Sequence, residues 1–231
     1  MSSGPLRIVV LLFPRVTQLD FTGPAQVFSK FPNSEVHLAW HDLEPVTTDA
    51  GWCIVPTTTL DDCPQADVLF VPGGAGAFDL FEDPKALDFL RLQAKKARWI
   101  TSVCTGSFTL AAAGLLTGYR ATSHWASLRM LEHFGVEPTS ERVVRDRNRI
   151  TGAGVTSGID FAFTLAAELF GDDEARKIQL AIEYDPEPPF DHGSPNKADP
   201  ETVKNIIAAT ENLRMATVLT ASALATAQHS A

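Results

Sequence analysis

A cysteine at the junction of two different residue patterns is the side chain of this sequence best suited to covalent chemistry. Cys104 directly follows the apolar run 99–103, and a stretch of small residues begins at Gly106, reaches Ala113 and stops at Gly114. The first pattern predicts a buried strand and the second predicts a short helix. A sharp turn between them would place the cysteine at the helix N-terminus, where free backbone N–H groups and the helix dipole favour an anion.

Two interpretations of Cys104 follow from this turn. In the first, we expect a lowered thiol pKa and a nucleophilic thiolate, by the same logic as a nucleophile elbow with sulfur in place of oxygen. In the second, the residue is an inert packed cysteine, because free cysteine is among the most buried residue types. The turn alone leaves both interpretations open.

An aspartate near the first strand is a candidate acid. The leucine-rich run 6–13 predicts a central strand, and Asp20 lies between Leu19 and Phe21, just before a predicted helix whose first turn suits Pro24. Aspartate in that place is either a helix cap or turn residue, or an acid near the carboxyl end of a strand, where open α/β sheets place their sites.

Two loops and one histidine complete the set of candidates. Gly73 and Gly74 follow the apolar run 66–71 and form either a simple tight loop or a pair of N–H donors for an anionic intermediate. They lack the lysine and hydroxyl residue of a phosphate-binding motif. His124 is either an activating base for a cysteine or a packed core histidine. The small-residue loop 151–158 either walls a pocket or caps the following helix.

Strand and helix patterns alternate along the chain, which predicts an α/β protein. We expect strands at 6–13, 35–40, 66–71, 99–103, 121–124, 142–145 and 148–151, with one or two short strands within 46–59. Helices are expected at 84–96, 106–113, 125–134, 159–170 and 172–184, and from Pro200 onward. The proline-rich arm 184–195 is apolar enough that we expect it to pack against another surface.

Composition limits the function classes. With 231 residues, 45% hydrophobic and 20% charged, the chain suits one domain over 1–231, with the arm and a last helix at about 184–231. A formal net charge of −9 argues against nucleic-acid binding. Three dispersed cysteines make neither a disulfide framework nor a zinc site, and a cytoplasmic setting is expected. The apolar run 6–13 contains Arg7 and is too short to span a bilayer, so we expect no membrane partner. We expect His37 and His41 to be packing or surface residues.

Several segments together resemble the ThiJ/PfpI superfamily, across nearly the whole chain. They are the βαβ alternation, the Pro72-Gly73-Gly74 loop, the cysteine elbow and the tail that begins Tyr184-Asp-Pro. The resemblance implies an α/β, flavodoxin-like three-layer sandwich with a mostly parallel central sheet and a cysteine nucleophile elbow. Within the superfamily, the isonitrile hydratase branch is similar in 12–14, 18–24, 102–107 and 121–125.

The same resemblance assigns roles to individual residues. It implies Cys104 as nucleophile, Asp20 as a proton-transferring acid whose pKa is raised by burial, and Thr105 as the hydroxyl residue on which catalysis depends. Gly73 and Gly74 match the loop that lends N–H groups to the site. Two more residues, Ala153 and Val155, match apolar substrate contacts. Thr105 stands where the peptidase branches carry histidine, which argues against a Cys–His peptidase, and His124 matches a position without a catalytic role.

The implied activity is that of a hydro-lyase, which adds water to an isonitrile to give an N-substituted formamide through a thioimidate on the cysteine. No metal or organic cofactor is implied, and a homodimer is expected. One alternative is a small-molecule or redox-sensing domain like those that regulators carry beside a helix-turn-helix module. A single helix after the arm leaves no room for that module, so we expect a standalone enzyme. The other alternative is a glyoxalase or chaperone of the same superfamily.

Overall fold

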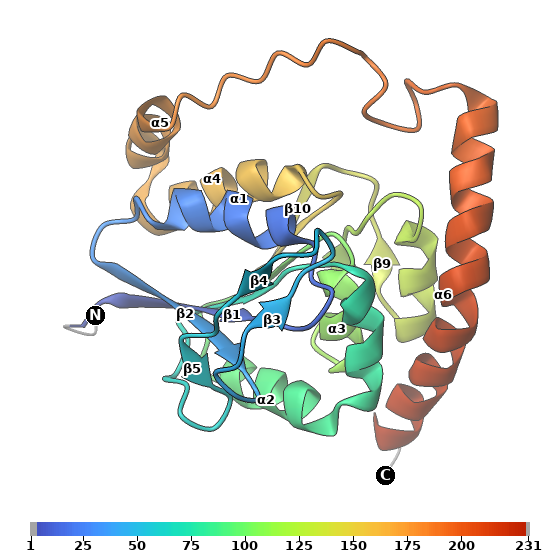
Figure 1. The fold of residues 1–231 in the computed structure, drawn as a ribbon, viewed down its shortest axis with the longest axis horizontal. Helices are drawn as coiled ribbons and strands as arrows, with labels where there is room; N and C mark the ends of the chain where they lie inside the picture. Colours follow the sequence, from blue (N-terminus) through green and yellow to red (C-terminus); the bar gives the residue numbers. More distant parts are fainter. Residues whose placement is uncertain (1–3, 230–231) are drawn as a thin grey trace.

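A seven-stranded sheet lies at the centre of the molecule (Figure 1). The computed structural model describes residues 4–229, with side chains as far as residue 224. The strand order is β10-β11-β7-β6-β1-β2-β5, and every neighbouring pair is parallel except β10 with β11. The strands are β1 (Leu6–Leu11), β2 (Ser34–Trp40), β5 (Thr58–Thr59), β6 (Val68–Val71), β7 (Trp99–Val103), β10 (Val143–Asp146) and β11 (Arg149–Gly152). The mostly parallel sheet expected from the sequence is confirmed.

Helices cover both faces of the sheet and complete the three layers. Alternate residues of β1 point to opposite faces, so that Ile8 packs with one core and Val9 with the other. One core includes α1 (Gln18–Phe28) and α4 (Ser157–Phe170), with α5 (Asp172–Ala181) beside α4. The other includes α2 (Pro84–Ala94), α3 (Gly106–Ala112) and the 3-10 helices η1 (Ala75–Glu82) and η2 (Leu128–Phe134).

Four short strands lie outside the central sheet. β3 (Val46–Thr47) pairs with β4 (Cys53–Ile54), and β8 (Arg120–Ala121) pairs with β9 (Glu137–Pro138). The region 46–59 thus holds three short strands instead of one or two. The strand expected at 121–124 ends at residue 121, because the N–H of Thr122 donates to the Thr151 hydroxyl, at 2.9 Å, instead of to a strand partner. The expected helix 125–134 is the shorter 3-10 helix η2.

The first helix begins earlier than the sequence indicates. We expected Pro24 in its first turn, but α1 starts at Gln18 and Pro24 lies inside it. Proline has no N–H to donate to the carbonyl four residues before it, which here belongs to Asp20. Asp20 therefore lies in the first turn of α1 and not before the helix.

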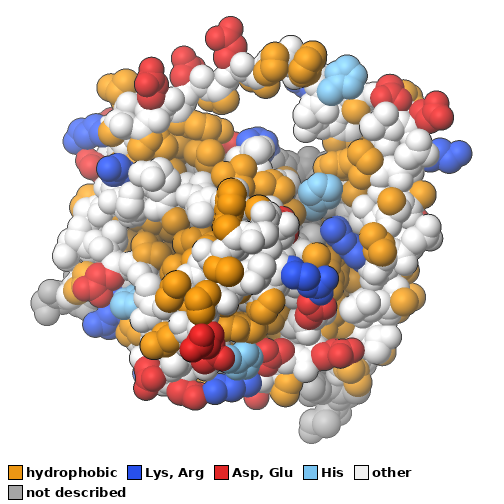
Figure 2. All heavy atoms as spheres, in the orientation of Figure 1, with side chains coloured by type: hydrophobic (Ala, Val, Ile, Leu, Met, Phe, Trp, Pro, Cys, Tyr) orange, Lys and Arg blue, Asp and Glu red, His pale blue; other side chains and the backbone are white. Residues whose placement is uncertain are grey.

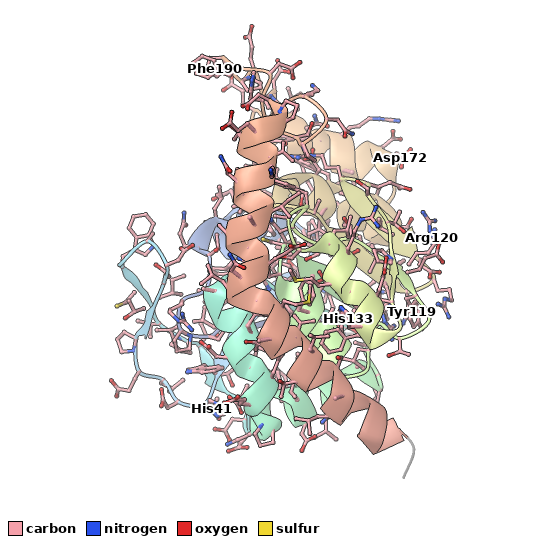
Figure 3. The ribbon with its side chains drawn as sticks, turned by 90° about the vertical axis from the view of Figure 1, so that its right-hand side faces the viewer. His41, Tyr119, Arg120, His133, Asp172 and Phe190 are labelled. Carbon is pink, nitrogen blue, oxygen red and sulfur yellow. The ribbon has the colours of Figure 1, made fainter. Side chains whose placement is uncertain are left out.

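A long arm and one helix complete the chain. The arm arches from α5 to the start of α6 (Pro200–His229) (Figure 1). Asp199 accepts a 2.9 Å hydrogen bond from the N–H of Thr202, as expected of a helix cap. The expectation that the arm packs is met only near its ends, since Phe190 is 79% exposed (Figure 3). Among the described residues, no helix combines the length and apolar character required to cross a membrane.

Candidate active site

The turn between β7 and α3 puts Cys104 in a backbone conformation that non-glycine residues rarely adopt. Its φ is +55°, in the left-handed region. Three hydrogen bonds hold this conformation: the N–H of Cys104 donates to the Gly152 carbonyl at 3.0 Å, and the Cys104 carbonyl accepts from the hydroxyls of Ser107 and Ser123, both at 2.8 Å. The elbow expected from the sequence is confirmed.

Asp20 brings a buried carboxyl to this elbow. The residue is fully buried, and Oδ2 accepts a 2.9 Å hydrogen bond from the N–H of Gly73. The other oxygen, Oδ1, is buried and lacks a hydrogen-bond partner among the described residues. Burial raises the pKa of Asp20 from 3.8 to about 7, against the opposing effects of the Gly73 bond and the Cys104 thiol. The charge of Asp49 raises this pKa further. The raised pKa expected for Asp20 is confirmed.

The thiol of Cys104 differs from expectation. Burial, followed by the negative charge of Asp20, raises its pKa well above the ordinary value. The N–H of Thr105 and the charge of Arg214 act in the opposite direction but do not compensate. The prediction of a lowered thiol pKa was therefore wrong, because it counted the helix N-terminus and not the loss of water around a side chain that is 6% exposed. The resting pair is a thiol beside a carboxyl that can take its proton.

The backbone N–H groups of the glycine loop after β6 donate to side chains of the same chain. The N–H of Gly73 donates to Asp20, and the N–H of Gly74 donates to Oγ1 of Thr105 at 2.9 Å. In return, the Thr105 hydroxyl donates to the Gly74 carbonyl at 3.0 Å. Direct donation from Gly73 and Gly74 to an anionic intermediate does not match this geometry, because both N–H groups are already occupied. The hydroxyl of Thr105 positions the loop and makes no hydrogen bond to Asp20 among those described.

Only glycine fits at either position of this loop. A Cβ at Gly73 would lie 2.6 Å from Asp20 Oδ2 and from the N of Thr105, which is closer than real Cβ contacts come. At Gly74 the φ is +139°, and a Cβ would lie 2.5 Å from the Arg15 carbonyl oxygen. The two adjacent glycines therefore mark two close approaches of the loop: Gly73 lies against the acid and Thr105, and Gly74 lies against the backbone of residues 15–17.

A cavity of about 440 Å³ lies beside the elbow. Most of its lining comes from residues 122–125, from residues 153–156 and, in the arm, from residues 193–196. Leu128 and residues 140–142 complete the lining. Ala153 and Val155, the two residues expected to contact substrate, both belong to the lining, and His124 lies in the same wall. Cys104 and Asp20 do not line the cavity, but Ser123, which does, donates its hydroxyl hydrogen bond to the Cys104 carbonyl. The part of the lining that comes from the arm was not foreseen from the sequence.

The histidines do not form a Cys–His pair or a metal site in the part of the chain described. Nδ1 of His124 accepts a 3.3 Å hydrogen bond from the N–H of Ala126, and its ring lies beside that of Trp125. Burial, and then the charge of Arg214, lowers the pKa of His124, so the ring is neutral at pH 7. His41 pairs with Asp83, as expected of a packing residue. No group of three or more potential ligands for a metal occurs in the described residues.

Arg214 of α6 lies near the cysteine elbow, and the sequence did not indicate it as a site residue. Its guanidinium donates to the hydroxyl of Ser127 at 2.7 Å and lies 5.1 Å from the centre of the Phe78 ring. Its positive charge also counteracts the rise in the Cys104 thiol pKa. The sequence offers one weak signal, which is an arginine on the helix face that carries Val218 and Ala221 into the core.

Comparison with known proteins places the fold and the site in a family. The model of the DJ-1/PfpI family matches residues 6–168, which include β1, the glycine loop, the cysteine elbow and most of α4. The chain belongs to the DJ-1/PfpI family. Its arm and α6 lie outside the matched residues.

Three members or relatives of the DJ-1/PfpI family are particularly informative. Isonitrile hydratase from Pseudomonas putida is 57% identical over 193 residues, which cover 84% of this chain and 85% of that protein. A crystal structure of a ThiJ/PfpI family protein from Pseudomonas syringae superposes with a TM-score of 0.91 and 42% identity, over 95% of this chain and 91% of the other. The HTH-type transcriptional regulator GbdR of Pseudomonas aeruginosa is 32% identical over 188 residues, which cover 78% of this chain and 50% of that protein.

Proposed function

We propose that this DJ-1/PfpI protein is an isonitrile hydratase, a hydro-lyase that converts an isonitrile and water to an N-substituted formamide. One observation carries the proposal: a fully buried carboxyl with a pKa of about 7 lies at the cysteine elbow, and its Oδ1 accepts no hydrogen bond from the residues that the structure describes. That group can both give and take a proton near neutral pH, as this reaction requires. The high identity to the Pseudomonas putida isonitrile hydratase supports the same substrate class.

In the first step, the thiol adds to the terminal carbon of the isonitrile R–N≡C. The S–H proton passes to the carboxylate of Asp20 as the sulfur of Cys104 attacks, and Asp20 then delivers that proton to the same carbon. The product is a covalent thioimidate, R–N=CH–S–Cys, which contains all the atoms of the isonitrile and the thiol. Because the thiol pKa is raised in the resting site, the sulfur is held as a thiol until its proton passes to Asp20.

In the second step, water adds to the thioimidate carbon. The Asp20 carboxylate takes a proton from the attacking water and delivers that same proton to the imine nitrogen, which gives a tetrahedral intermediate R–NH–CH(OH)–S–Cys. Collapse of that intermediate forms the formamide carbonyl and breaks the C–S bond. The sulfur leaves with a proton, which restores the thiol of Cys104 and the carboxylate of Asp20. The scheme needs no reactant besides the isonitrile and water.

The remaining site residues act by positioning in this scheme. Thr105 and Gly74 exchange two hydrogen bonds, and Gly73 donates to the Asp20 carboxyl, so the loop fixes the acid relative to the elbow. Ala153 and Val155 supply apolar cavity wall for the substituent of the isonitrile. Apolar wall suits a group that offers no hydrogen bonds.

The direct test is formation of the formamide from a panel of aliphatic and aromatic isonitriles. We expect turnover by the unmodified protein and none by Cys104→Ala. Mass spectrometry of protein quenched during turnover should show the mass of one isonitrile added at Cys104. Full activity of Cys104→Ala would overturn the mechanism, and consumption of methylglyoxal without formamide formation would replace the proposed activity with that of a glyoxalase.

A sensing role is the second candidate, and the likeness to a transcriptional regulator favours it over other binding roles. The match covers half of that regulator and includes most of the present chain. A sensor would bind its ligand at the cavity without turnover. Release of formamide in excess over protein distinguishes an enzyme from such a binding domain.

We also propose that the protein is a cytoplasmic homodimer with a small-molecule substrate and without a nucleic-acid or membrane partner. The three cysteines are free thiols in the structure, as in a reducing compartment. Exposed apolar side chains on the arm and α6 support self-association, with Phe190 79% and Leu213 80% exposed. The acidic net charge of −9 disfavours binding to phosphate backbones.

A further inference from the structure

Arg214 connects two segments that both reach the cysteine elbow. Its guanidinium lies over the ring of Phe78 on η1, the helix that follows the glycine loop, and donates to Ser127 at the start of η2. The glycine loop is hydrogen-bonded to Thr105, the residue after Cys104.

The segment before η2 provides the second connection. The N–H of Ser127 donates to the His124 carbonyl at 2.9 Å, and the hydroxyl of Ser123 donates to the Cys104 carbonyl at 2.8 Å. Ser127 is itself buried, with 1% of its surface exposed, so its bond to Arg214 is shielded from water. A single guanidinium thereby touches both segments that contact the elbow.

The packing of α6 fixes the place of this guanidinium. Val218 and Ala221 are buried in the core four and seven residues after Arg214, on the same helix face. That face packs against η1, η2 and α3 (Figure 3, where α6 crosses the molecule and His133 marks η2). Figure 2 shows basic side chains on the face beside α6. Arg214 is not among the residues that line the cavity next to the elbow.

We propose that Arg214 is a positioning residue for Cys104: it joins the two segments that hold the elbow and supplies the positive charge that faces the sulfur when it becomes a thiolate. Two charges act on the thiol pKa in opposite directions: the negative charge of Asp20 on α1 raises it, and the positive charge of Arg214 on α6 lowers it. The charge of Asp49 in turn raises the pKa of Asp20, and the charge of Arg214 lowers the pKa of His124. Among the described residues, Arg214 is therefore the cation whose charge offsets that of Asp20 at this sulfur. Its kinetic consequence rests on the proposed isonitrile hydration, whereas its effect on the thiol does not.

The test compares Arg214→Gln, Arg214→Lys and Ser127→Ala, with Lys204→Gln as a control that removes an exposed cation from the same helix. Alkylation of Cys104 by iodoacetamide is followed against pH by peptide mass spectrometry, with the exposed Cys53 as internal reference. Circular dichroism and thermal unfolding check that each variant is folded.

We expect Arg214→Gln to slow alkylation of Cys104 by about threefold to tenfold at neutral pH, since one unit of pKa is a tenfold change in thiolate below the pKa. Cys53 should be unchanged. Arg214→Lys keeps the charge and should retain most of the rate, and Ser127→Ala, which removes the hydrogen bond but keeps the charge, should slow alkylation by less than Arg214→Gln does. For hydration, Arg214→Gln should lower kcat and leave KM nearly unchanged.

Two outcomes overturn the proposal. One is an Arg214→Gln profile at Cys104 that coincides with those of the unmodified protein and Lys204→Gln. The other is an equal loss in Arg214→Lys and Arg214→Gln, which would mean that the side chain only packs. If the unmodified protein does not hydrate isonitriles, the proposed function fails while the alkylation profiles still decide the role of Arg214.

Discussion

The N–H of Gly73 donates a 2.9 Å hydrogen bond to Oδ2 of Asp20, and this contact determines which oxygen of the acid handles protons. A backbone N–H can only donate, so Oδ2 must remain an acceptor in both protonation states. When Asp20 carries a proton, the proton is therefore favoured on Oδ1, which is buried and makes no other hydrogen bond within the described part of the chain. The raised pKa of about 7 makes both states accessible near neutral pH.

Asp20→Asn separates proton transfer from the shape of the site. The amide can still accept from Gly73 but cannot carry the proton, so we predict that kcat for hydration falls about 10²- to 10⁴-fold. Loss of the negative charge also removes a cause of the raised thiol pKa of Cys104. Alkylation of Cys104 at neutral pH should therefore become faster while turnover becomes slower, as measured by peptide mass spectrometry and formamide release.

Asp49→Asn is the matched control for this substitution. Its charge raises the pKa of Asp20 without touching the thiol, so we expect a small downward shift of the acidic limb of the pH–rate profile and an intact maximal rate. Hydration by Asp20→Asn at the rate of the unmodified protein would show that another group transfers the proton.

These side chains illustrate how far the sequence leads. Local patterns of apolar and small residues indicate the elements β1, β6, β7 and α3. The parallel sheet and the elbow at Cys104 could therefore be predicted from the sequence. The start of α1 was misplaced because Pro24 is typical of a first turn, whereas tertiary packing carries the helix through it.

Properties that depend on three-dimensional burial could not be predicted in the same way. The thiol pKa of Cys104 is set by loss of water and by Asp20, 84 residues earlier in the chain, and no local pattern records either effect. The contacts of Arg214 depend on how α6 returns across η1 and η2. The sequence shows the adjacent glycines 73 and 74, but it does not show that the N–H of Gly73 donates to the carboxyl of Asp20, because that contact joins residues 53 positions apart.

Burial of Asp20 makes stability depend on pH. Its folded pKa of about 7 exceeds the ordinary 3.8, so its favourable contribution is complete below about pH 4 and is lost as the pH rises through 7. Three units of pKa correspond to roughly 4 kcal/mol at most. Relative to Asp20→Asn, the unmodified protein should therefore lose free energy of unfolding between pH 4 and 7 and change little above pH 8. Urea unfolding of both proteins across this range measures the difference, and a difference independent of pH would contradict a raised pKa.

Thr105→Val tests the two hydrogen bonds between the elbow and the glycine loop. Valine has nearly the same shape but leaves the N–H of Gly74 buried without its acceptor, which costs about 1–3 kcal/mol. We expect a stable but weakened fold and a kcat reduced about tenfold or more, because the loop also holds Asp20. Thr105→Ser retains the hydroxyl and should recover most of both losses in thermal unfolding and formamide assays. Equal activity of the valine and threonine proteins would remove Thr105 from the mechanism.

Self-association is tested by sedimentation velocity. A homodimer should sediment at about twice the chain mass of 25.0 kDa, at micromolar concentration. If the exposed apolar side chains of the arm and α6 form the contact, replacing Phe190 and Leu213 together by aspartate should shift the protein toward the monomer without loss of helical signal. Leu180→Asp changes a side chain of α5 that is 82% exposed and serves as the control. A monomer in the unmodified protein would contradict the dimer.

Gly73→Ala examines the closest approach in the site. The added Cβ would lie 2.6 Å from Asp20 Oδ2 and from the N of Thr105, so either the loop or the acid must move. A displaced acid loses its alignment with the sulfur of Cys104, and we predict a fall in kcat of about 10²-fold or more, with destabilisation of about 1–3 kcal/mol from the strained contact. Gly4→Ala is the control, because a Cβ there meets no atom within 4 Å. If Gly73→Ala kept full hydration activity and the same Cys104 alkylation profile, the loop would not be what aligns acid and thiol, and the alignment would have to come from α1 alone.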